Sequence, residues 1–436
     1  MLKRYSCFFL MIIFILTFCT ACNDAMEIDD SVYAIVIGID KGTTNRVRMT
    51  IQYPTYKEGG SSGGQSMASG DKSKENALEN SNVHTIESSS ILEGINLFNT
   101  AITRAVSLTH TKMLVISEEF TREGIEKYVA PLARFRETRR TMQVVISQGD
   151  AEEFIRQNKT NIGPSISKAA ELMVTQSDVT GYFPKVSFFN LYEAFVSPYS
   201  QGIAAYAGIN KFTEIQDKKA QDKSPLAVDK GILPGELARS GVTKREFVGT
   251  AVFSGPKMVG TLDSLDTRYM LMVQSKFRKG IMTFKDKNQP EAVIPCDMRM
   301  GRKTKVSAKF EDGKPIIDVK INLEADVGAI QSRIEYEDFN KIGELNELLK
   351  ECIETGVKKM IDKTQKEFKA DIFGFGFEVA KKFSTIKKFE EYGWLGHYPD
   401  AQVNVIVEVN IRRTGLMIKS VPIHSYETDK GTGGGQ

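Results

Sequence analysis

Hydrophobic positions in the N-terminal half of the chain alternate between strand and helix patterns. The β-branched run VYAIVIGI at 32–39 predicts a buried strand, and the alternating segment RVRMTIQY at 46–53 predicts its antiparallel hairpin partner. Further strands are expected at 83–88, 112–117 and 142–147, and amphipathic helices at 90–106, from Thr121, at 165–176 and at 187–196. Strands that alternate with helices indicate an α/β sheet.

One helix start carries a polar signature. Asp150 is followed three residues later by Glu153, which resembles a capping box, in which a side chain accepts hydrogen bonds from the free N–H groups of the first helical turn. A helix is therefore expected to begin directly after Asp150.

The C-terminal half predicts a hairpin, paired long strands and a long helix. The segment FVGTAVFSGPKMVGTL at 247–262 predicts a hairpin, and a helix follows at 264–274. Strands are expected across 291–326 with a turn at 311–314, and again at 403–415. The segment between them, 337–368, predicts a long amphipathic helix with a stripe made of Ile342, Leu345, Leu349, Cys352, Val357, Met360 and Ile361.

These elements predict a mixed α+β (α/β) chain of several domains. At about 150 residues per domain, 436 residues suggest about three. The expected division is a signal peptide at 1–21, an N-terminal α/β domain at 22–200 with a disordered loop near 57–82, a middle domain at 201–288 with a linker near 211–246, a C-terminal α/β domain at 289–424 and a disordered tail at 425–436.

The first residues predict export and a lipid anchor. Lys3 and Arg4 precede 13 residues, 7–19, that are apolar except for Thr17, and the small residues Thr20-Ala21 lead directly to Cys22. This order is typical of a signal peptide and resembles the bacterial lipobox, in which the cysteine becomes the first residue and its sulfur carries a diacylglycerol. Two acyl chains suffice for stable anchoring. Cys22 is therefore the predicted lipid-attachment residue.

The alternative at this end is an uncleaved anchor. The 18 residues from Tyr5 to Cys22 carry no charge, which is the lower limit for a membrane-spanning helix. The short apolar core and the position of Cys22 favour the lipoprotein. Both interpretations place the remainder of the chain outside the cytoplasm.

Composition and charge exclude several classes of function. The chain is 41% hydrophobic and 26% charged, which is ordinary for a folded protein. The net charge of +3 falls to about +1 when Lys3 and Arg4 leave with the signal peptide. Such a charge gives no general attraction to nucleic acid, so no nucleic-acid partner is expected.

Candidate chemistry is sparse. The chain has four histidines, and neither they nor the cysteines have metal-ligand spacing, so no metal and no cofactor is expected. Cys296 and Cys352 could form a disulfide in an oxidising compartment. The place of Cys352 on the apolar stripe of the long helix favours a buried free thiol instead.

Two glycine-containing segments resemble nucleotide loops only in part. In GIDKG at 38–42 a Gly follows Lys where a P-loop needs Ser or Thr, so a turn at the end of a strand is expected. The GFG at 374–376 lacks the third Gly of a dinucleotide fingerprint, so a helix start or close packing is expected. No G-x-S-x-G motif occurs.

A basic cluster leaves two interpretations open. Arg134, Arg136, Arg139 and Arg140 surround Glu137. The cluster is either a solvated helix end or a contact with anionic lipid or with an acidic loop of a partner.

Several blocks, in this order, resemble the Ger(x)C family, the C subunits of spore germinant receptors. They are MEIDDSVYAIVIGIDKG after the lipobox, ILEGINLFNTAITRAVSLTHTKMLVISEEFTREGI, FVGTAVFSGPKMVGTLDSLDTR, and DIFGFG with VNIRRTG. The resemblance implies a non-enzymatic lipoprotein of three mixed α/β domains on the outer face of the inner spore membrane. It also implies assembly with two integral membrane subunits, A and B, into a receptor that triggers germination on sensing a nutrient.

The two alternatives to a receptor subunit are a solute-binding lipoprotein and an extracytoplasmic hydrolase. A solute-binding lipoprotein would need two similar lobes around a cleft with aromatic and polar groups, but no internal repeat is visible and Trp394 is the sole tryptophan. An extracytoplasmic hydrolase would need a catalytic constellation, and no such motif was found. A receptor subunit that acts through protein contacts is the expectation.

Overall fold

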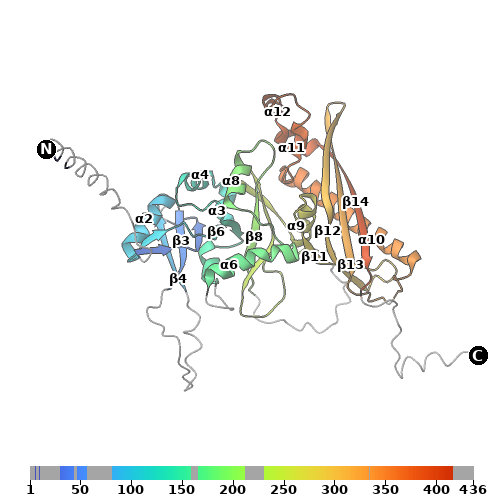
Figure 1. The fold of residues 1–436 in the computed structure, drawn as a ribbon, viewed down its shortest axis with the longest axis horizontal. Helices are drawn as coiled ribbons and strands as arrows, with labels where there is room; N and C mark the ends of the chain where they lie inside the picture. The colour runs from blue at the N-terminus through green and yellow to red at the C-terminus, as the bar shows by residue number, and fades with distance from the viewer. Residues whose placement is uncertain are drawn as a thin grey trace, which may run out of the picture.

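The protein is a mixed α+β structure built on two large sheets. The computed structural model describes residues 5, 9, 30–43, 47–55, 81–158, 165–211, 230–332 and 334–415. Figure 1 shows an eight-stranded sheet in the N-terminal half and a four-stranded sheet with a long helix in the C-terminal half. Cys22, most of the expected loop at 57–82, residues 212–229 of the expected linker and the tail lie outside the described residues.

The eight-stranded sheet has the order β10-β9-β8-β7-β6-β2-β3-β4. Its central strands β2, β6, β7 and β8 are parallel, and antiparallel strands complete both edges. The hairpins predicted at the two ends are confirmed as β2–β3 and β9–β10. The bounds are Val36–Asp40 (β2), Val47–Pro54 (β3), Ser81–Ser88 (β4), Met113–Ser117 (β6), Gln143–Ser147 (β7), Ile203–Ile209 (β8), Arg245–Ser254 (β9) and Lys257–Leu262 (β10).

Helices cover both faces of this sheet, which explains its unbroken apolar strands. Successive residues of β2 point to opposite sides: Ile37 packs in one hydrophobic cluster and Val36 in the other. The first cluster includes side chains of α2 (Ile91–Ala101), α3 (Glu118–Glu123), α4 (Glu126–Arg134) and α8 (Phe188–Val196), and the second those of α5 (Ala151–Arg156) and α6 (Ile166–Thr175). Short α7 (Ser177–Thr180) leads away from α6.

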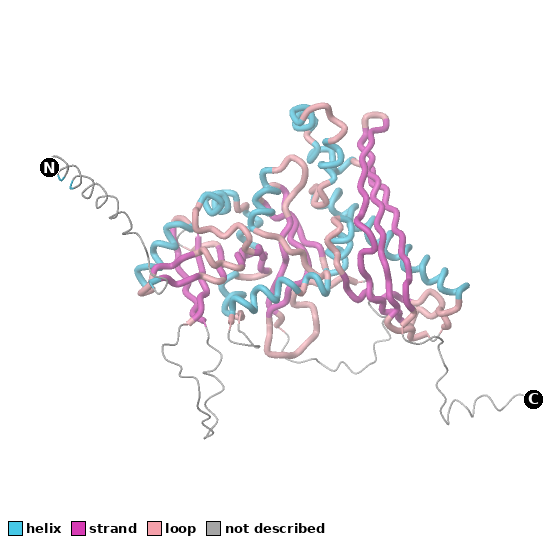
Figure 2. The backbone as a smooth tube through the Cα atoms, in the orientation of Figure 1, coloured by secondary structure: helices cyan, strands magenta, loops and turns pink. Residues whose placement is uncertain are grey.

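The four-stranded sheet has the order β11-β12-β13-β14 and lies against one long helix. Figure 2 shows how far the β12–β13 hairpin extends. The predicted long helix is confirmed as α10, which continues into the π-helix η2. The bounds are Lys279–Lys285 (β11), Val293–Glu311 (β12), Lys314–Val327 (β13), Gln402–Arg413 (β14), Phe339–Lys363 (α10) and Thr364–Phe368 (η2).

The expected apolar stripe of α10 is wrong at one position. Leu345, Leu349, Ile353 and Val357 are fully buried at a spacing of four residues, whereas Cys352 is exposed. Ile353 continues the i, i+4 row that faces the sheet, and Cys352 lies one residue, about 100°, away from it.

The segment expected as a middle domain contributes to both sheets. Its strands β8, β9 and β10 belong to the eight-stranded sheet, where Ala205 pairs with Val145 of β7. Its strand β11 instead pairs with β12 in the four-stranded sheet. Helix α9 (Ser264–Val273) connects the two, so a boundary at 200/201 would divide a continuous hydrogen-bonded sheet. Hydrophobic patterning identifies strands but does not show which strands pair.

The sequence patterns predicted where helices occur more accurately than where they begin and end. The helix expected at 90–106 ends at Ala101, and β5 (Ala105–Ser107) follows and pairs with β1 (Ser31–Tyr33). The helix expected from Thr121 is split into α3 and α4 at Gly124, whose φ of 110° is outside the helical region.

The expected capping box after Asp150 is also wrong. The Asp150 side chain makes no capping hydrogen bond. Instead the carboxylate of Asp40, at the end of β2, accepts from the N–H groups of Ala151 and Glu152 at 2.7 and 2.9 Å. The turn expected at 40–42 thus begins with Asp40, which is buried and caps helix α5.

Candidate functional site

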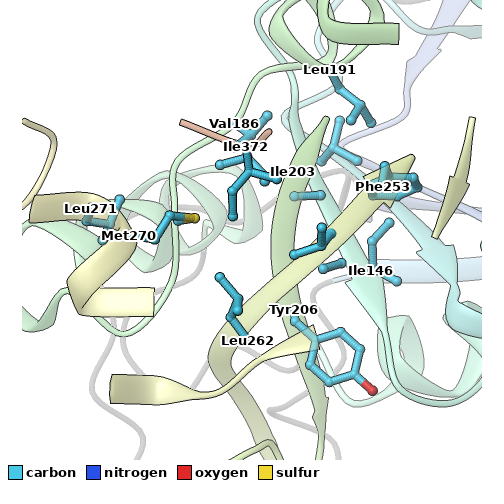
Figure 3. Packing of buried hydrophobic residues seen from close by; sticks show 14 of the residues in the cluster. Ile146, Val186, Leu191, Ile203, Tyr206, Phe253, Leu262, Met270, Leu271 and Ile372 are labelled. Atoms are coloured by element: carbon cyan, nitrogen blue, oxygen red, sulfur yellow. The ribbon is translucent and has the colours of Figure 1, made fainter. Parts of the chain in front are cut away.

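A short segment packs between the two sheets, which α9 connects along the chain. It is here called the junction loop, residues 369–376, and it runs from the end of η2 into the first residues of α11 (Phe375–Ala380). Its Ile372 is 3% exposed and packs in the same cluster as Val186 and Ile203 of the N-terminal half, as Figure 3 shows. Left-handed backbone at Lys369 (φ 50°) and Gly374 (φ 80°) marks its two turns. The loop is the place where C-terminal residues enter the core of the N-terminal half.

Main-chain hydrogen bonds hold the junction loop from both sides. The N–H of Gln201, just before β8, donates to the carbonyl oxygen of Asp371 at 2.6 Å. The side-chain amide of Gln274, at the end of α9, donates to the carbonyl oxygen of Ile372 at 2.7 Å. The loop is therefore bonded both to the segment that leads into β8 and to the end of α9.

Asp371 organises the loop from within. Its Oδ1 accepts from the N–H groups of Phe373 and Gly374, and its Oδ2 accepts from Gly376 N–H and from the indole N–H of Trp394, all at 2.8–3.0 Å. Burial raises the pKa of the Asp371 carboxyl, and these hydrogen bonds act in the opposite direction. Because both oxygens are occupied by protein donors, the carboxylate is suited to positioning the loop rather than to proton transfer.

Gly376 permits the closest approach at the junction. A Cβ added there would lie 2.3 Å from the carbonyl oxygen of Tyr199 and 2.5 Å from Cδ1 of Trp394. Gly374 forms the N-cap of α11. The prediction of a helix start and close packing at 374–376 is therefore confirmed.

A groove of about 730 Å³ opens beside the junction loop. Tyr199 lies in its wall, stacked between Phe377 at 4.7 Å and Phe389 at 5.0 Å between ring centroids. The lining carries the charged side chains of Lys185, Lys276 and Glu193, and Lys185 forms an ion pair with Asp178 at 2.6 Å. The described lining contains neither His nor Cys. An aromatic stack with flanking charged side chains can contact a ligand or a partner chain.

A second groove, of about 810 Å³, lies between α9, β11 and α10. Arg268 in its wall is 4% exposed, donates to the carbonyl oxygens of Thr180 and Ile281 at 2.9 and 2.8 Å, and stacks over Tyr182 at 4.1 Å. Burial lowers the pKa of this guanidinium. Its hydrogen bonds tie α7 to β11, which is a structural role.

The histidines and cysteines are dispersed. His84 and His397 each stack on a tyrosine, and His110 meets the ring of Tyr33 edge to face. Among the described residues there is no group of three or more His, Cys, Asp or Glu that could hold a metal ion. Cys296 is buried and Cys352 exposed, and no disulfide joins them. The expectation of a buried free thiol holds for Cys296 and is wrong for Cys352. His424 lies outside the described residues.

The predicted lipid-attachment residue Cys22 is not among the described residues. No helix in the described part of the chain is long and apolar enough to cross a membrane.

Sequence reasoning treated DIFGFG only as a block of resemblance and missed the role of Asp371. A usable local signal exists, because an Asp followed within five residues by two glycines at the start of a helix is typical of an Asp side chain that binds its own turn. The contributions of Trp394 and Gln201 have no such signal, since these residues lie far from Asp371 in the sequence.

Comparison with known protein families matches both halves of the chain. Residues 24–209 match the model described as "Spore germination protein N-terminal domain", and residues 248–415 match "Spore germination B3/ GerAC like, C-terminal". The two matches include β2 through β8 and the junction loop.

Relatives from Bacillus subtilis (strain 168) align over most of their length. YfkR is 22% identical over 426 residues, covering 96% of this chain and 98% of the relative. Spore germination protein KC is 24% identical over 424 residues, covering 94% and 95%. A solved structure titled "Crystal Structure of the GerBC protein" is similar with a TM-score of 0.47 and 15% identity, covering 86% of this chain and 96% of that chain. With both halves matched in order, the chain belongs to the Ger(x)C family of spore germination proteins, which includes the GerAC-like receptor C subunits.

Proposed function

We propose that this chain is the lipid-anchored C subunit of a nutrient germinant receptor on the outer face of the inner spore membrane. It is attached through acylated Cys22 and works through contacts with the integral membrane A and B subunits of the receptor. The observation that carries the proposal is the ordered match of both family models behind an apolar run that ends at Cys22.

The geometry of the junction supports a role in protein contacts. The most buried carboxylate, Asp371, is fully occupied by N–H donors, and the groove beside it has aromatic and lysine side chains. Such a surface can bind a segment of a partner protein. We therefore propose a non-enzymatic scaffold that conveys the state of the receptor through contacts, with the two sheets coupled by the junction loop.

Anchoring is tested by mass spectrometry of the mature protein from membranes. The expected result is an N-terminal peptide that begins at Cys22 and carries the mass of a diacylglycerol. Cys22→Ala should lose that mass and either leave the membrane or keep its signal peptide. Finding the wild-type protein processed but without acyl mass would refute the anchor.

The role in germination is tested by deletion and by pull-down. Spores without this protein should lose the response to the nutrient of its own receptor and keep germination that is triggered without receptors. Pull-down from spore membranes should recover an A or B subunit. Normal responses to every nutrient would refute the role.

The competing function is direct capture of a small nutrient. The aromatic groove beside Tyr199 is the place where such a ligand would bind. Isothermal titration of the purified protein with candidate nutrients distinguishes the two, because micromolar affinity in the absence of A and B would favour a solute-binding lipoprotein.

A further inference from the structure

The connection after α4 carries unpaired positive charge. Arg134, Arg136, Arg139 and Arg140 fall within seven residues, and three of them are exposed. Among the described residues no ion pair to any of the four is seen, and Arg139 donates a hydrogen bond to the hydroxyl of Thr141 at 3.1 Å. The acidic residue between them, Glu137, accepts a hydrogen bond from the N–H of Leu108.

Two of these arginines form the rim of an apolar groove of about 470 Å³. Its floor is built from three helices and includes Leu92, which is 38% exposed although it is apolar. The lining residues are Leu92 from α2, Ala130, Pro131 and Arg134 from α4, Phe135 and Arg136 after it, and Tyr192 from α8. We call this surface, with Arg139 and Arg140, the arginine groove.

The arginine groove lies close to the first described strand of the chain. In β1, Val32 pairs with Val106 of β5, and Leu108, two residues on, is hydrogen-bonded to Glu137 of the arginine segment. One strand pairing and one hydrogen bond therefore connect β1 to the arginine segment.

A lipid on Cys22 would keep this surface at the bilayer. Cys22 precedes Ser31 by nine residues, which span at most about 32 Å when fully extended. This tether limits the distance of Ser31 from the headgroups, and the arginine groove is connected to β1 through β5 and Glu137. The C-terminal sheet has no comparable constraint, because it is joined to the anchor only through the N-terminal half.

We propose that the arginine groove rests on the surface of an anionic bilayer and so orients the protein on the membrane. This inference depends on the anchoring of Cys22 in the proposed function. Guanidinium groups bind phosphate oxygens in a bidentate manner, and an exposed apolar floor can cover the glycerol region between headgroups. Each basic residue near an anionic leaflet favours the docked state by about fivefold.

The test is arginine footprinting of the full-length acylated protein in lipid nanodiscs. Phenylglyoxal labelling is followed by peptide mass spectrometry in discs of phosphatidylcholine alone and of equal parts phosphatidylcholine and phosphatidylglycerol. Arg134, Arg136 and Arg140 should react at least threefold more slowly in the anionic discs. The reason is that a fivefold preference per arginine places most of the protein in the docked state, where these side chains are covered. Arg278 and Arg302, exposed in the C-terminal half, should react equally in both.

A matched pair of variants makes the test specific. Arg134→Gln with Arg136→Gln should restore fast labelling of Arg140 in anionic discs. Arg302→Gln with Lys303→Gln, which removes the same charge from exposed positions of β12, should leave Arg140 protected. Circular dichroism of both variants checks that they fold.

The outcomes separate this inference from the anchor. Acyl mass on Cys22, with equal labelling of Arg140 in both lipid mixtures, would overturn the inference and leave the anchor intact. Protection that appears only when A and B subunits are present would also overturn it, in favour of an acidic protein segment. Absence of acyl mass would overturn the proposed anchor, and the inference with it.

Discussion

The indole N–H of Trp394 donates a hydrogen bond of 2.8 Å to Oδ2 of Asp371, a residue 23 positions earlier in the chain. Both side chains are essentially inaccessible to solvent. The bond completes the set of donors around the carboxylate and fixes the junction loop against α13 (Trp394–His397). The sole tryptophan of the protein therefore has a structural task at the join between its two sheets.

Trp394→Phe should lower the free energy of unfolding by about 1–3 kcal/mol, because it leaves a buried carboxylate oxygen one donor short. Tyr392→Phe is the matched control in the same region, since the buried hydroxyl of Tyr392 has no hydrogen-bond partner. It should change stability by less than about 0.5 kcal/mol. Urea unfolding of both variants checks the difference, and equal losses would contradict the role of the indole N–H.

Two glycines of α10 should respond to alanine in opposite directions. A Cβ at Gly356 would lie 2.4 Å from the ring of Tyr269 in α9, whereas a Cβ at Gly343 has nothing within 4 Å. Gly356→Ala should destabilise by about 1–3 kcal/mol through overpacking. Gly343→Ala should stabilise by about 0.5–1 kcal/mol through helix propensity. Thermal melts of the two variants measure both signs, and a shared sign would show that α10 does not pack on α9 as described.

Asp40 should matter more to helix α5 than the helix's own N-cap residue. Asp40→Ala removes the acceptor of two helix N–H groups and should cost about 1–2 kcal/mol. Asp150→Ala removes only an exposed carboxylate near Arg48 and should cost less than about 0.5 kcal/mol. Chemical unfolding compares the variants. A larger loss for Asp150→Ala would restore the capping box as the dominant interaction.

The same residue predicts a pH dependence. Burial raises the pKa of the Asp40 carboxyl in the folded state above its unfolded value. Between those two pKa values the folded state binds more protons, so the contribution of Asp40 to stability falls as the pH rises through this window. Asp40→Asn should remove that part of the slope. An unchanged dependence of the unfolding free energy on pH would show that Asp40 titrates equally in both states.

The two cysteines outside the N-terminal segment should differ in reactivity. Burial raises the pKa of the Cys296 thiol to about 12, and Cys352 is exposed. A disulfide-exchange reagent should therefore modify Cys352 in the native mature protein and reach Cys296 only after denaturation. Cys352→Ser should abolish the native reaction. A reaction that required prior reduction would reveal a disulfide between the two.

Much of the fold follows from short-range pattern. The strand β2 is visible as a run of β-branched residues, the turn between β12 and β13 by its turn residues, and the helix α10 by its period of 3.6 residues. The hairpin β9–β10 is likewise visible as two apolar runs around a turn. Each of these patterns involves only a few neighbouring residues, so it can be recognised without knowledge of the tertiary structure. The family was also accessible, because its blocks follow one another in the sequence.

The candidate site was accessible only in part. The close packing of Gly376 was expected from its neighbouring residues, whereas the contact that enforces it comes from Tyr199. The expectation that Cys352 lies on the buried stripe failed by a single residue, because the neighbouring sheet selects Ile353 and its row. When apolar residues occupy a wide stripe of a helix, the sequence alone does not show which of them face the sheet and which lie at the exposed margin.

The type and order of most elements can be predicted from the residues alone, because they depend on neighbours along the chain. Which distant residues form hydrogen bonds with one another depends on the packed fold. The carboxylate that caps α5 comes from Asp40, 111 residues before the helix, and the donor that completes Asp371 comes from Trp394. A buried polar group must find a partner wherever the fold brings one within about 3 Å, and that choice depends on how the sheets and helices pack rather than on the residues beside it.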